Sequence, residues 1–387
     1  MAMRKVIGTA HHSKRVGPLP IGCRLCVKGA KLVLLATGIC MGRCWYCPLS
    51  KRKRNKDVVV ANEWWVKEDK DVLEEARLCD AQGAGITGGD PMCRLDRTVH
   101  HIRLLKREFG KDFHIHLYTP GTGGTEKAIA KLYRAGLDEI RFHPDFLAGA
   151  RADLALVESA LKYDWDVGCE IPVIPGRYTQ MRGFANRISE MGVHFLNLNQ
   201  LEISETNAAE MERRGFMAES DESFAVRGSL RTAEGLLKHC AKNTGLRVHY
   251  CTVRLKDGVQ LRNRLKRRAR NVARGFDIVT GEGLLVRGAF YLPKTLPTFG
   301  YNRMLAGIST HRKAAYGRQL SRAMRALMAS SGLAPGMMEL DLDRFRILTG
   351  AWMAEKLADR AKEAGLRPAV VEEYPTWDGL ITDLRQV

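Results

Sequence analysis

Three cysteines lie within eight residues of one another, at Cys40, Cys44 and Cys47. They follow an apolar run that predicts a strand, and a loop in this place lets all three thiolates point to one side. Four-iron clusters normally take four thiolates, so three would leave one iron with an open position, where a metal can bind and activate a small molecule. The alternative is a zinc knuckle, which usually pairs two half-sites, whereas this triad opens a repeated pattern of strands and helices.

The spacing of these cysteines, with Tyr46 directly before the last one, resembles the signature of the radical S-adenosylmethionine (SAM) superfamily. The resemblance implies a 4Fe-4S cluster on Cys40, Cys44 and Cys47 whose open iron chelates S-adenosylmethionine. One electron, from a low-potential donor such as ferredoxin or flavodoxin, would split the sulfonium C–S bond. The resulting 5′-deoxyadenosyl radical would abstract hydrogen from a substrate, so we expect an enzyme.

The second predicted strand leads into Gly88, Gly89, Asp90 and Pro91. Glycines permit close backbone approach to a ligand, and a carboxylate can accept a hydrogen bond from an ammonium group. The segment resembles the Gly-Gly-Glu-Pro motif of the superfamily, which binds the amino group of S-adenosylmethionine, with Asp90 in place of Glu. By itself the same tetrapeptide would indicate only a turn.

Later strands of the pattern carry polar residues in or after their apolar runs. In the superfamily such positions contact the ribose, the carboxylate, the sulfonium or the substrate. The alternative for each is a capping or hydrogen-bonded core residue, although polar groups inside apolar strands indicate a polar barrel lining. The resemblance thus implies cofactor contacts for Tyr46 of the cysteine loop and for Thr119, His143, Glu170 and Asn199.

A second metal site is suggested by Cys23 and Cys26, which are spaced as a metal half-site ahead of the first strand. Cys251 could complete the set if the later chain folds back, and the ligand would be zinc or an auxiliary iron–sulfur cluster. The alternative is that Cys23 and Cys26 are free thiols at a turn.

Six apolar runs between residues 31 and 206 alternate with segments of helical spacing. Strands that alternate with helices pair in parallel through right-handed crossovers. The predicted fold is α/β: a partial (β/α)6 barrel of the radical SAM type (31–206), preceded by an N-terminal extension (1–30) and followed by a smaller, basic C-terminal α/β region (207–387). The six runs are Lys31–Gly38, Ala84–Thr87, Phe113–Thr119, Glu139–His143, Val167–Ile174 and His194–Ile203.

In the C-terminal region we expect a hairpin around Gly281–Gly283, helices at Arg312–Ala329 and Ile347–Ala364, and a strand at Ala369–Glu372.

The composition is that of a globular protein, with 45% hydrophobic and 27% charged residues in 387. No run reaches the roughly 20 apolar residues of a membrane span, and residues 1–10 lack the apolar core of a secretory signal. We therefore expect a cytoplasmic protein without a membrane partner, in which the ten cysteines are thiols or metal ligands because the compartment is reducing.

The formal charge of +19 favours a polyanionic partner. Cations concentrate between Arg254 and Arg274, where a helix would present them on an outer face, and again at Lys51–Lys56 after the cysteine loop. We expect RNA, such as a tRNA undergoing modification, as the substrate; the alternative is a solvated charged face. The residues predicted to contact nucleic acid are Arg262, Arg264, Lys266, Arg267, Arg268 and Arg270.

Two other functions remain open. The chain resembles archaeal and bacterial proteins related to pyruvate formate-lyase activating enzymes, which abstract hydrogen from a glycine of a partner enzyme; this resemblance implies a protein substrate. A non-catalytic, metal-containing nucleic-acid-binding protein would use the same basic tract but would leave Gly88–Pro91 and the barrel without a role.

Overall fold

Short apolar strands that alternate with amphipathic helices build a parallel sheet in the first part of the chain. The computed structural model describes residues 4–387 and divides at Arg264 and Leu265 into two compact units. In the first unit seven strands pair in parallel, in the order β13-β10-β9-β8-β7-β6-β3. They are β3 (Leu32–Thr37), β6 (Gly83–Gly88), β7 (His114–Thr119), β8 (Glu139–Phe142), β9 (Asp166–Val173), β10 (Phe195–Gln200) and β13 (Arg247–Cys251).

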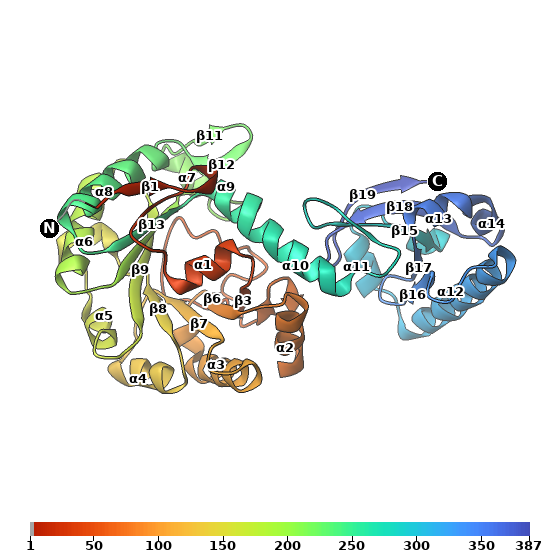
Figure 1. Ribbon diagram of the computed structural model, residues 1–387, viewed down its shortest axis with the longest axis horizontal. Coiled ribbons are helices and arrows are strands. Elements are labelled where there is room, and N and C mark those ends of the chain that lie inside the picture. Colours follow the sequence, from red (N-terminus) through yellow and green to blue (C-terminus); the bar gives the residue numbers. More distant parts are fainter. Residues whose placement is uncertain (1–3) are drawn as a thin grey trace. The chain divides into compact units, whose positions relative to one another are not determined.

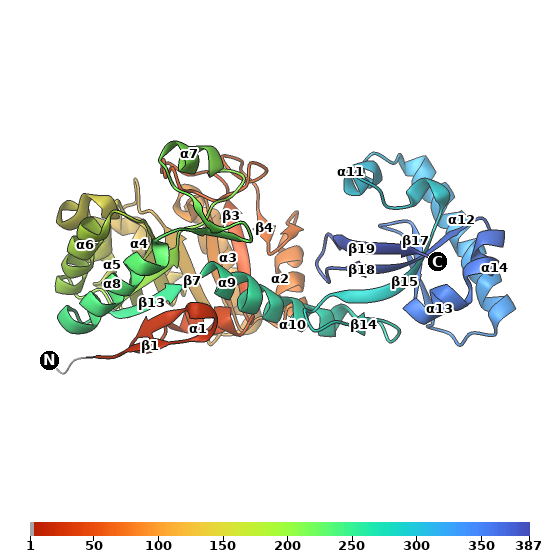
Figure 2. The ribbon, with the colours of Figure 1, turned by 90° about the horizontal axis from the view of Figure 1, so that it is seen from above.

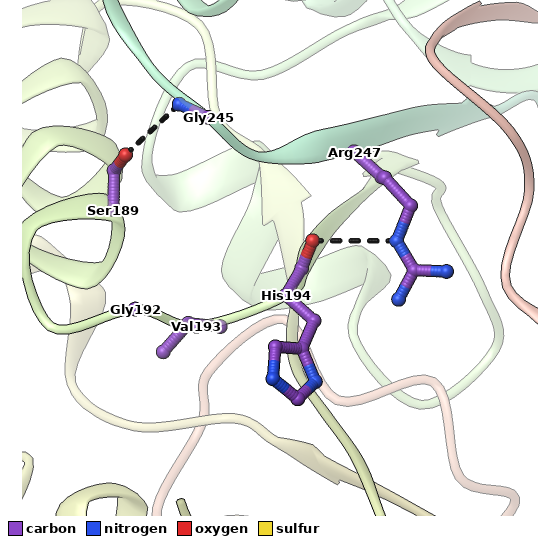
Figure 3. Close-up of a pocket in the computed structure, with 6 residues that line it drawn as sticks. All are labelled: Ser189, Gly192, Val193, His194, Gly245 and Arg247. Carbon is purple, nitrogen blue, oxygen red and sulfur yellow. Dashed lines mark hydrogen bonds between the residues drawn. The ribbon is translucent and has the colours of Figure 1, made fainter.

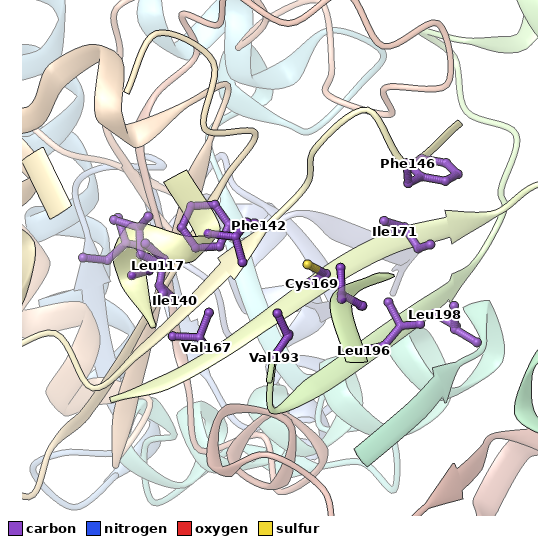
Figure 4. Packing of buried hydrophobic residues seen from close by; sticks show 14 of the residues in the cluster. Leu117, Ile140, Phe142, Phe146, Val167, Cys169, Ile171, Val193, Leu196 and Leu198 are labelled. Carbon is purple, nitrogen blue, oxygen red and sulfur yellow. The ribbon is translucent and has the colours of Figure 1, made fainter. Parts of the chain in front are cut away.

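Helices cover the outer face of this curved sheet (Figure 1). In α3, for example, Val99, Ile102 and Leu105 recur at helical spacing and are buried. Figure 4 shows Leu117, Ile140 and other outward-facing strand residues in the core that these helices seal. The covering helices are α2 (Asp69–Leu78), α3 (Leu95–Phe109), α4 (Glu126–Arg134), α5 (Ala155–Ala160), α6 (Tyr178–Glu190) and α8 (Ser229–Asn243).

The edges of the sheet are antiparallel. At one edge β2 (Lys14–Val16) pairs with β13, and β1 (Val6–Gly8) pairs with β2. At the other edge β4 (Val60–Ala61) and β5 (Trp64–Trp65) follow β3. The strands thus form an open barrel, and the short helix α1 (Ile21–Val27) lies on its concave side against β6 and β7 (Figure 1). The predicted α/β fold is confirmed.

The first unit extends well beyond residue 206, where we placed the end of the barrel. The reason is β13, which adds a seventh parallel strand through the register Asn197↔His249 and is covered by α8. The N-terminal extension also belongs to this sheet, because Val16 pairs with Val248. Smaller elements of the unit are α7 (Ala208–Arg213), β11 (Ala218–Ser220), β12 (Ser223–Val226), α9 (Val253–Leu255) and η4 (Lys256–Leu261).

The second unit is an antiparallel sheet in the order β16-β17-β15-β18-β19, with β14 beside β15. Its strands are β14 (Ile278–Val279), β15 (Leu285–Tyr291), β16 (Met338–Asp341), β17 (Arg346–Thr349), β18 (Arg367–Glu373) and β19 (Ile381–Gln386). Its helices, seen in Figure 2, include α11 (Tyr301–Ala306), α12 (Thr310–Ser331), α13 (Ala351–Lys356) and α14 (Ala358–Glu363). The helix α10 (Arg262–Val272) crosses the boundary between the units.

One predicted helix of this unit, Ile347–Ala364, is partly wrong. Its first residues form β17, because Ile347 and Leu348 are buried in the sheet opposite β15, and Gly350 ends the strand. Among residues 4–387 no helix is long and apolar enough to cross a membrane.

Candidate functional site

The cysteine loop leaves the carboxyl end of β3 and is closed at its base. Gly38 donates its backbone N–H to the Lys56 carbonyl at 2.8 Å, and Asn55 donates back to the Gly38 carbonyl at 2.9 Å. A side chain at Gly38 would collide with the backbone of Lys53. The loop that carries the three thiols is therefore held at a fixed place at the rim of the barrel.

Within the loop, Cys40 and Cys44 approach each other around Gly42. The Gly42 N–H donates to Cys40 Sγ at 3.2 Å. A Cβ atom on Gly42 would lie 3.3 Å from Cys40 Sγ and 3.9 Å from Cys44 Sγ, so a larger residue would crowd the Cys40 sulfur and contact that of Cys44. Cys40, Cys44 and Cys47 are all half-buried and form no disulfide. Burial raises the pKa of the Cys40 and Cys44 thiols, so a metal must displace their protons on binding.

Gly88, the last residue of β6, and Gly89 after it lie directly against the start of this loop. Gly89 donates to the Thr37 carbonyl at 2.8 Å, and Asp90 donates to the Ile39 carbonyl at 2.7 Å. Gly88 has φ +148° and its Cβ would lie 2.1 Å from the Thr37 oxygen. Glycine is thus needed here for close packing of two backbones, and this packing brings Asp90 beside the cysteine loop.

Asp90 is fully buried at the carboxyl ends of β6 and β7. Its Oδ1 accepts from the Met92 N–H at 3.0 Å and from the Thr119 hydroxyl at 2.8 Å. Its Oδ2 has no hydrogen-bond partner. Burial raises the pKa of Asp90, although the two donors oppose this. The Oδ2 atom of Asp90 therefore stays available as an acceptor. Thr119, which we predicted as a cofactor contact, donates to Asp90 and orients its carboxylate.

Tyr46 and His143 connect the cysteine loop to β8 and β9. His143 Nδ1 lies 2.7 Å from the Glu170 carbonyl, which can only accept, so His143 Nε2 accepts from the Tyr46 hydroxyl at 2.8 Å. Burial lowers the pKa of His143, so the ring is neutral near pH 7. Asn207 also holds the loop, through a 3.0 Å bond to the Tyr46 carbonyl.

The Glu170 carboxylate points into the barrel and accepts hydrogen bonds from three side chains. Arg141 Nη1, Asn197 Nδ2 and Asn199 Nδ2 each donate to it at 2.9 Å. Burial opposes the charged form, yet the Arg141 guanidinium and the two amides together hold the pKa of Glu170 below its usual range. Glu170 and Asn199, which we predicted as cofactor contacts, therefore bind each other within one buried network.

Arg141, the cation at the centre of this network, was not predicted from the sequence. Arg141 is 2% exposed and also contacts Glu139 and, at 3.1 Å, the Tyr118 hydroxyl. His116 extends the network to Lys31 at 3.3 Å. Alternation along β7 and β8 was the available signal, because His114, His116 and Tyr118 occupy every second position of an apolar strand.

The structure places Cys23, Cys26 and Cys251 around two amide side chains. Cys26 Sγ donates to Gln260 Oε1 at 2.9 Å, Gln260 Nε2 lies 3.6 Å from Cys251 Sγ, and Asn197 Nδ2 donates to Cys23 Sγ at 3.3 Å. Burial raises the pKa of Cys23 to about 11 and that of Cys251 to about 12, which favours thiols. Within the described part of the chain, no three His, Cys, Asp or Glu side chains, those of Cys40, Cys44 and Cys47 included, are grouped closely enough to hold a single metal ion. The second metal stays a prediction.

The basic tract exposes less of its charge than we expected, and its contact with nucleic acid stays a prediction. Of its six residues only Arg270 is exposed, while Arg268 is buried and donates to the Pro375 carbonyl. Arg264 binds Asn62 at 2.7 Å and Glu63 at 2.5 Å. Internal contacts engage part of the charge that we assigned to nucleic acid. The half-buried members are Arg262, Arg264, Lys266 and Arg267.

Figure 3 shows a surface depression whose residues include His194 and Arg247. These residues stand at the amino ends of β10 and β13, whereas the cysteine loop follows the carboxyl end of β3. Because the strands are parallel, the depression lies at the opposite end of the strands from the cysteine loop. Arg247 also pairs there with Asp166, at 2.7 Å from Oδ2. The depression is therefore separate from the candidate site.

The residues at the rim of the barrel fit an iron–sulfur cluster with S-adenosylmethionine. Cys40, Cys44 and Cys47 supply three thiol donors in one loop, fewer than the four thiolates that complete a cluster. The unpartnered Oδ2 of Asp90 supplies an acceptor in the adjacent loop. The two loops follow the neighbouring parallel strands β3 and β6. They lie at the carboxyl ends of these strands, where β/α barrels carry their active sites.

Comparisons with known proteins agree with this assignment. A family model described as the radical SAM superfamily matches residues 34–148, and a model described as a domain of unknown function (DUF8061) matches residues 316–384. A protein of Methanocaldococcus jannaschii named "Putative glycyl-radical enzyme activating enzyme" is 44% identical over 277 residues, which cover 70% of this chain and 73% of that protein.

The similar solved structures share much less sequence identity with this chain. SuiB of Streptococcus suis bound to S-adenosylmethionine has a TM-score of 0.41 at 12% identity, over 58% of this chain and 50% of that chain. The radical S-adenosylmethionine methyltransferase TsrM of Kitasatospora setae has a TM-score of 0.36 at 13% identity, over 64% and 53% of the two chains. This chain thus spans about half the length of each.

Proposed function

This chain belongs to the radical SAM superfamily, and from that premise we propose that it is an activating enzyme that removes a hydrogen atom from a glycine residue of a partner protein. The observation that carries the proposal is the 44% identity to the archaeal relative named for that activity. The three thiols and the free oxygen of Asp90 at one barrel edge support the radical chemistry itself.

Each residue of the site then has a role. Cys40, Cys44 and Cys47 would hold the 4Fe-4S cluster, and Asp90 would accept a hydrogen bond from the amino group of S-adenosylmethionine. When bound, these groups supply a 5′-deoxyadenosyl radical after one-electron reduction by a donor such as ferredoxin or flavodoxin. The hydroxyl of Tyr46 holds the cysteine loop against the barrel through its bond to His143.

The polar side chains that line the barrel would not exchange protons with the reacting groups. The buried side chains of Arg141 and Asn197 both donate to Glu170, and His143 is neutral. Such a lining would hold its polar groups fixed by hydrogen bonds and leave none of them as a mobile proton donor beside the radical. The substrate glycine would enter at the edge of the sheet that carries the cysteine loop.

The substrate class can be tested by following hydrogen. Anaerobically reconstituted protein is incubated with S-adenosylmethionine, a reductant and an extract of source cells grown on glycine deuterated at Cα. We expect deuterium in the 5′-deoxyadenosine product, measured by mass spectrometry, after ribonuclease treatment of the extract but not after protease treatment. Loss of transfer after ribonuclease alone would favour the RNA substrate predicted from charge.

Two variants control this experiment. Cys44→Ala should abolish cluster assembly and deuterium transfer while the fold persists. Cys240→Ala, a buried cysteine on α8, should leave both unchanged. Full iron content and turnover in Cys44→Ala would contradict the assignment of the loop.

A further inference from the structure

Helix α12 of the second unit is strongly basic on its exposed side. Its sequence from Thr310 to Ser331 contains five Lys and Arg residues and no Asp or Glu. The opposite side anchors the helix, because Leu320, Ala323 and Leu327 are buried over the sheet. The anchored helix therefore presents its charge from a fixed backbone.

Three of these cations form a single stripe. At 100° per residue, Arg318, Arg322 and Arg325 fall within roughly 60° of one another and lie opposite Leu320 and Leu327. All three arginines are exposed. The stripe runs about 10 Å along the helix axis, since each residue adds 1.5 Å.

No ion pair engages these arginines among the residues that the structure describes. This distinguishes α12 from the tract at α10, where Arg264 and Arg268 have partners within the fold. We propose that the stripe Arg318–Arg322–Arg325 binds the phosphate backbone of a nucleic acid. The proposal is independent of the substrate of the radical chemistry.

The surface fits phosphates better than it fits a protein. Protein interfaces depend on buried aromatic or large apolar anchors, and none of the exposed large apolar side chains of the described chain lies in α12. Arginine forks bind phosphate oxygens in pairs. Backbone binding needs only charge at regular intervals, which this stripe supplies.

The test uses the full chain and fluorescence anisotropy. Labelled single-stranded RNA, duplex DNA of the same sequence and polyglutamate are titrated with the parent protein and with the triple variant Arg318→Ala, Arg322→Ala, Arg325→Ala. Loss of three phosphate contacts should make the slope of log affinity against log salt concentration shallower by about 2 to 3. If parent and variant bind equally at 1 M salt, the variant should bind roughly 100-fold more weakly than the parent at 0.1 M salt. The RNA and DNA arms show which nucleic acid is preferred.

A matched control removes the same charge elsewhere, from exposed positions on α3 and α4: Arg103→Ala, Arg107→Ala, Lys127→Ala. We expect this control and the triple Arg→Lys variant to bind nearly as the parent does, with unchanged Tm for all variants. An equal loss in the control would mean that only overall charge matters and would overturn the proposal. If polyglutamate binding depends on the stripe as strongly as nucleic-acid binding does, the proposal is overturned in favour of an acidic protein partner. If the parent does not bind nucleic acid at all, the proposal is also overturned.

Discussion

Replacing Asp90 with Asn would separate the binding role of this residue from its structural role. Its Oδ1 accepts from Met92 and Thr119, and the carbonyl of an asparagine can keep both bonds. Its Oδ2 has no partner, and in asparagine this position becomes an amide nitrogen, which cannot accept from an ammonium group. The substitution therefore keeps the turn and removes only the acceptor.

The expected loss in S-adenosylmethionine affinity follows from the charge of both groups. A hydrogen bond to a charged group contributes about 1.5–3 kcal/mol, and about 1.4 kcal/mol corresponds to a factor of ten. Asp90→Asn should therefore weaken binding by roughly 10- to 140-fold.

The stability of the fold should not fall with the affinity. Burial raises the pKa of Asp90, so the folded chain holds this proton more tightly than the unfolded chain does. Stability is then lost as the pH rises through the folded pKa, because a charge becomes buried. Asparagine avoids that cost, and the Tm of Asp90→Asn at neutral pH should equal or exceed that of the parent.

Both quantities are measured on anaerobically reconstituted protein, with isothermal titration for S-adenosylmethionine, iron analysis for the cluster and thermal unfolding for Tm. Asp96→Asn is the matched control, because the Asp96 side chain on α3 is 94% exposed. A variant with a full cluster that binds S-adenosylmethionine as tightly as the parent would refute the role given to Asp90.

Three further substitutions test the interior of each unit by denaturant unfolding. Arg141→Met should destabilise the first unit by about 3–5 kcal/mol, because it leaves the buried Glu139 and the 17%-exposed Glu170 without their cation. Since Arg141 lowers the pKa of Glu170, the deficit should shrink as the pH falls from about 4, the pKa of an unfolded glutamate, through the lower pKa of the folded parent. A deficit independent of pH would contradict the pairing. In Gly22→Ala the new Cβ would lie 2.6 Å from Arg141 Nη2. The cost of overpacking, about 1–3 kcal/mol, should outweigh the gain in helix propensity of about 1 kcal/mol, so we expect a destabilised variant. A stabilised variant would show that α1 does not pack on this guanidinium. Arg346→Met should cost about 1–3 kcal/mol in the second unit, because the buried Glu373 loses a 2.7 Å bond to Arg346 but keeps Arg287 as its cation. An unchanged midpoint would count against the pair of Arg346 and Glu373.

The strands of the barrel could be predicted because each is an apolar run between turns. All six predicted runs overlap strands of the parallel sheet, from β3 to β10. The seventh, β13, could not be assigned to this sheet from its own residues, since an isolated apolar run at Arg247–Cys251 fits either unit equally well. Its pairing with β10 depends on the crossover through α8, which brings His249 opposite Asn197.

The candidate site was predictable in part for a similar reason. Cys40, Cys44 and Cys47 are close in sequence, so their proximity in space needs no knowledge of the fold. The bond between Tyr46 and His143 joins residues 97 positions apart, and the contact of Arg141 with Glu170 depends on which faces of β8 and β9 point inward. Spacing along the chain carries no information about such pairs until the register of the sheet is known.

The basic segments illustrate the same limit for surfaces. A count along the chain favours residues 254–274, where cations are densest, yet the fold places Arg268 in the interior and gives Arg264 an acidic partner. The density of cations along the sequence does not measure the electrostatic potential at the surface, because a guanidinium that is paired inside the fold attracts a polyanion only weakly. In α12 the cations are fewer, but apolar residues on the opposite face keep Arg318 and Arg322 in solvent. Amphipathic spacing, rather than the number of charges, is therefore the better guide to where this chain can meet a polyanion.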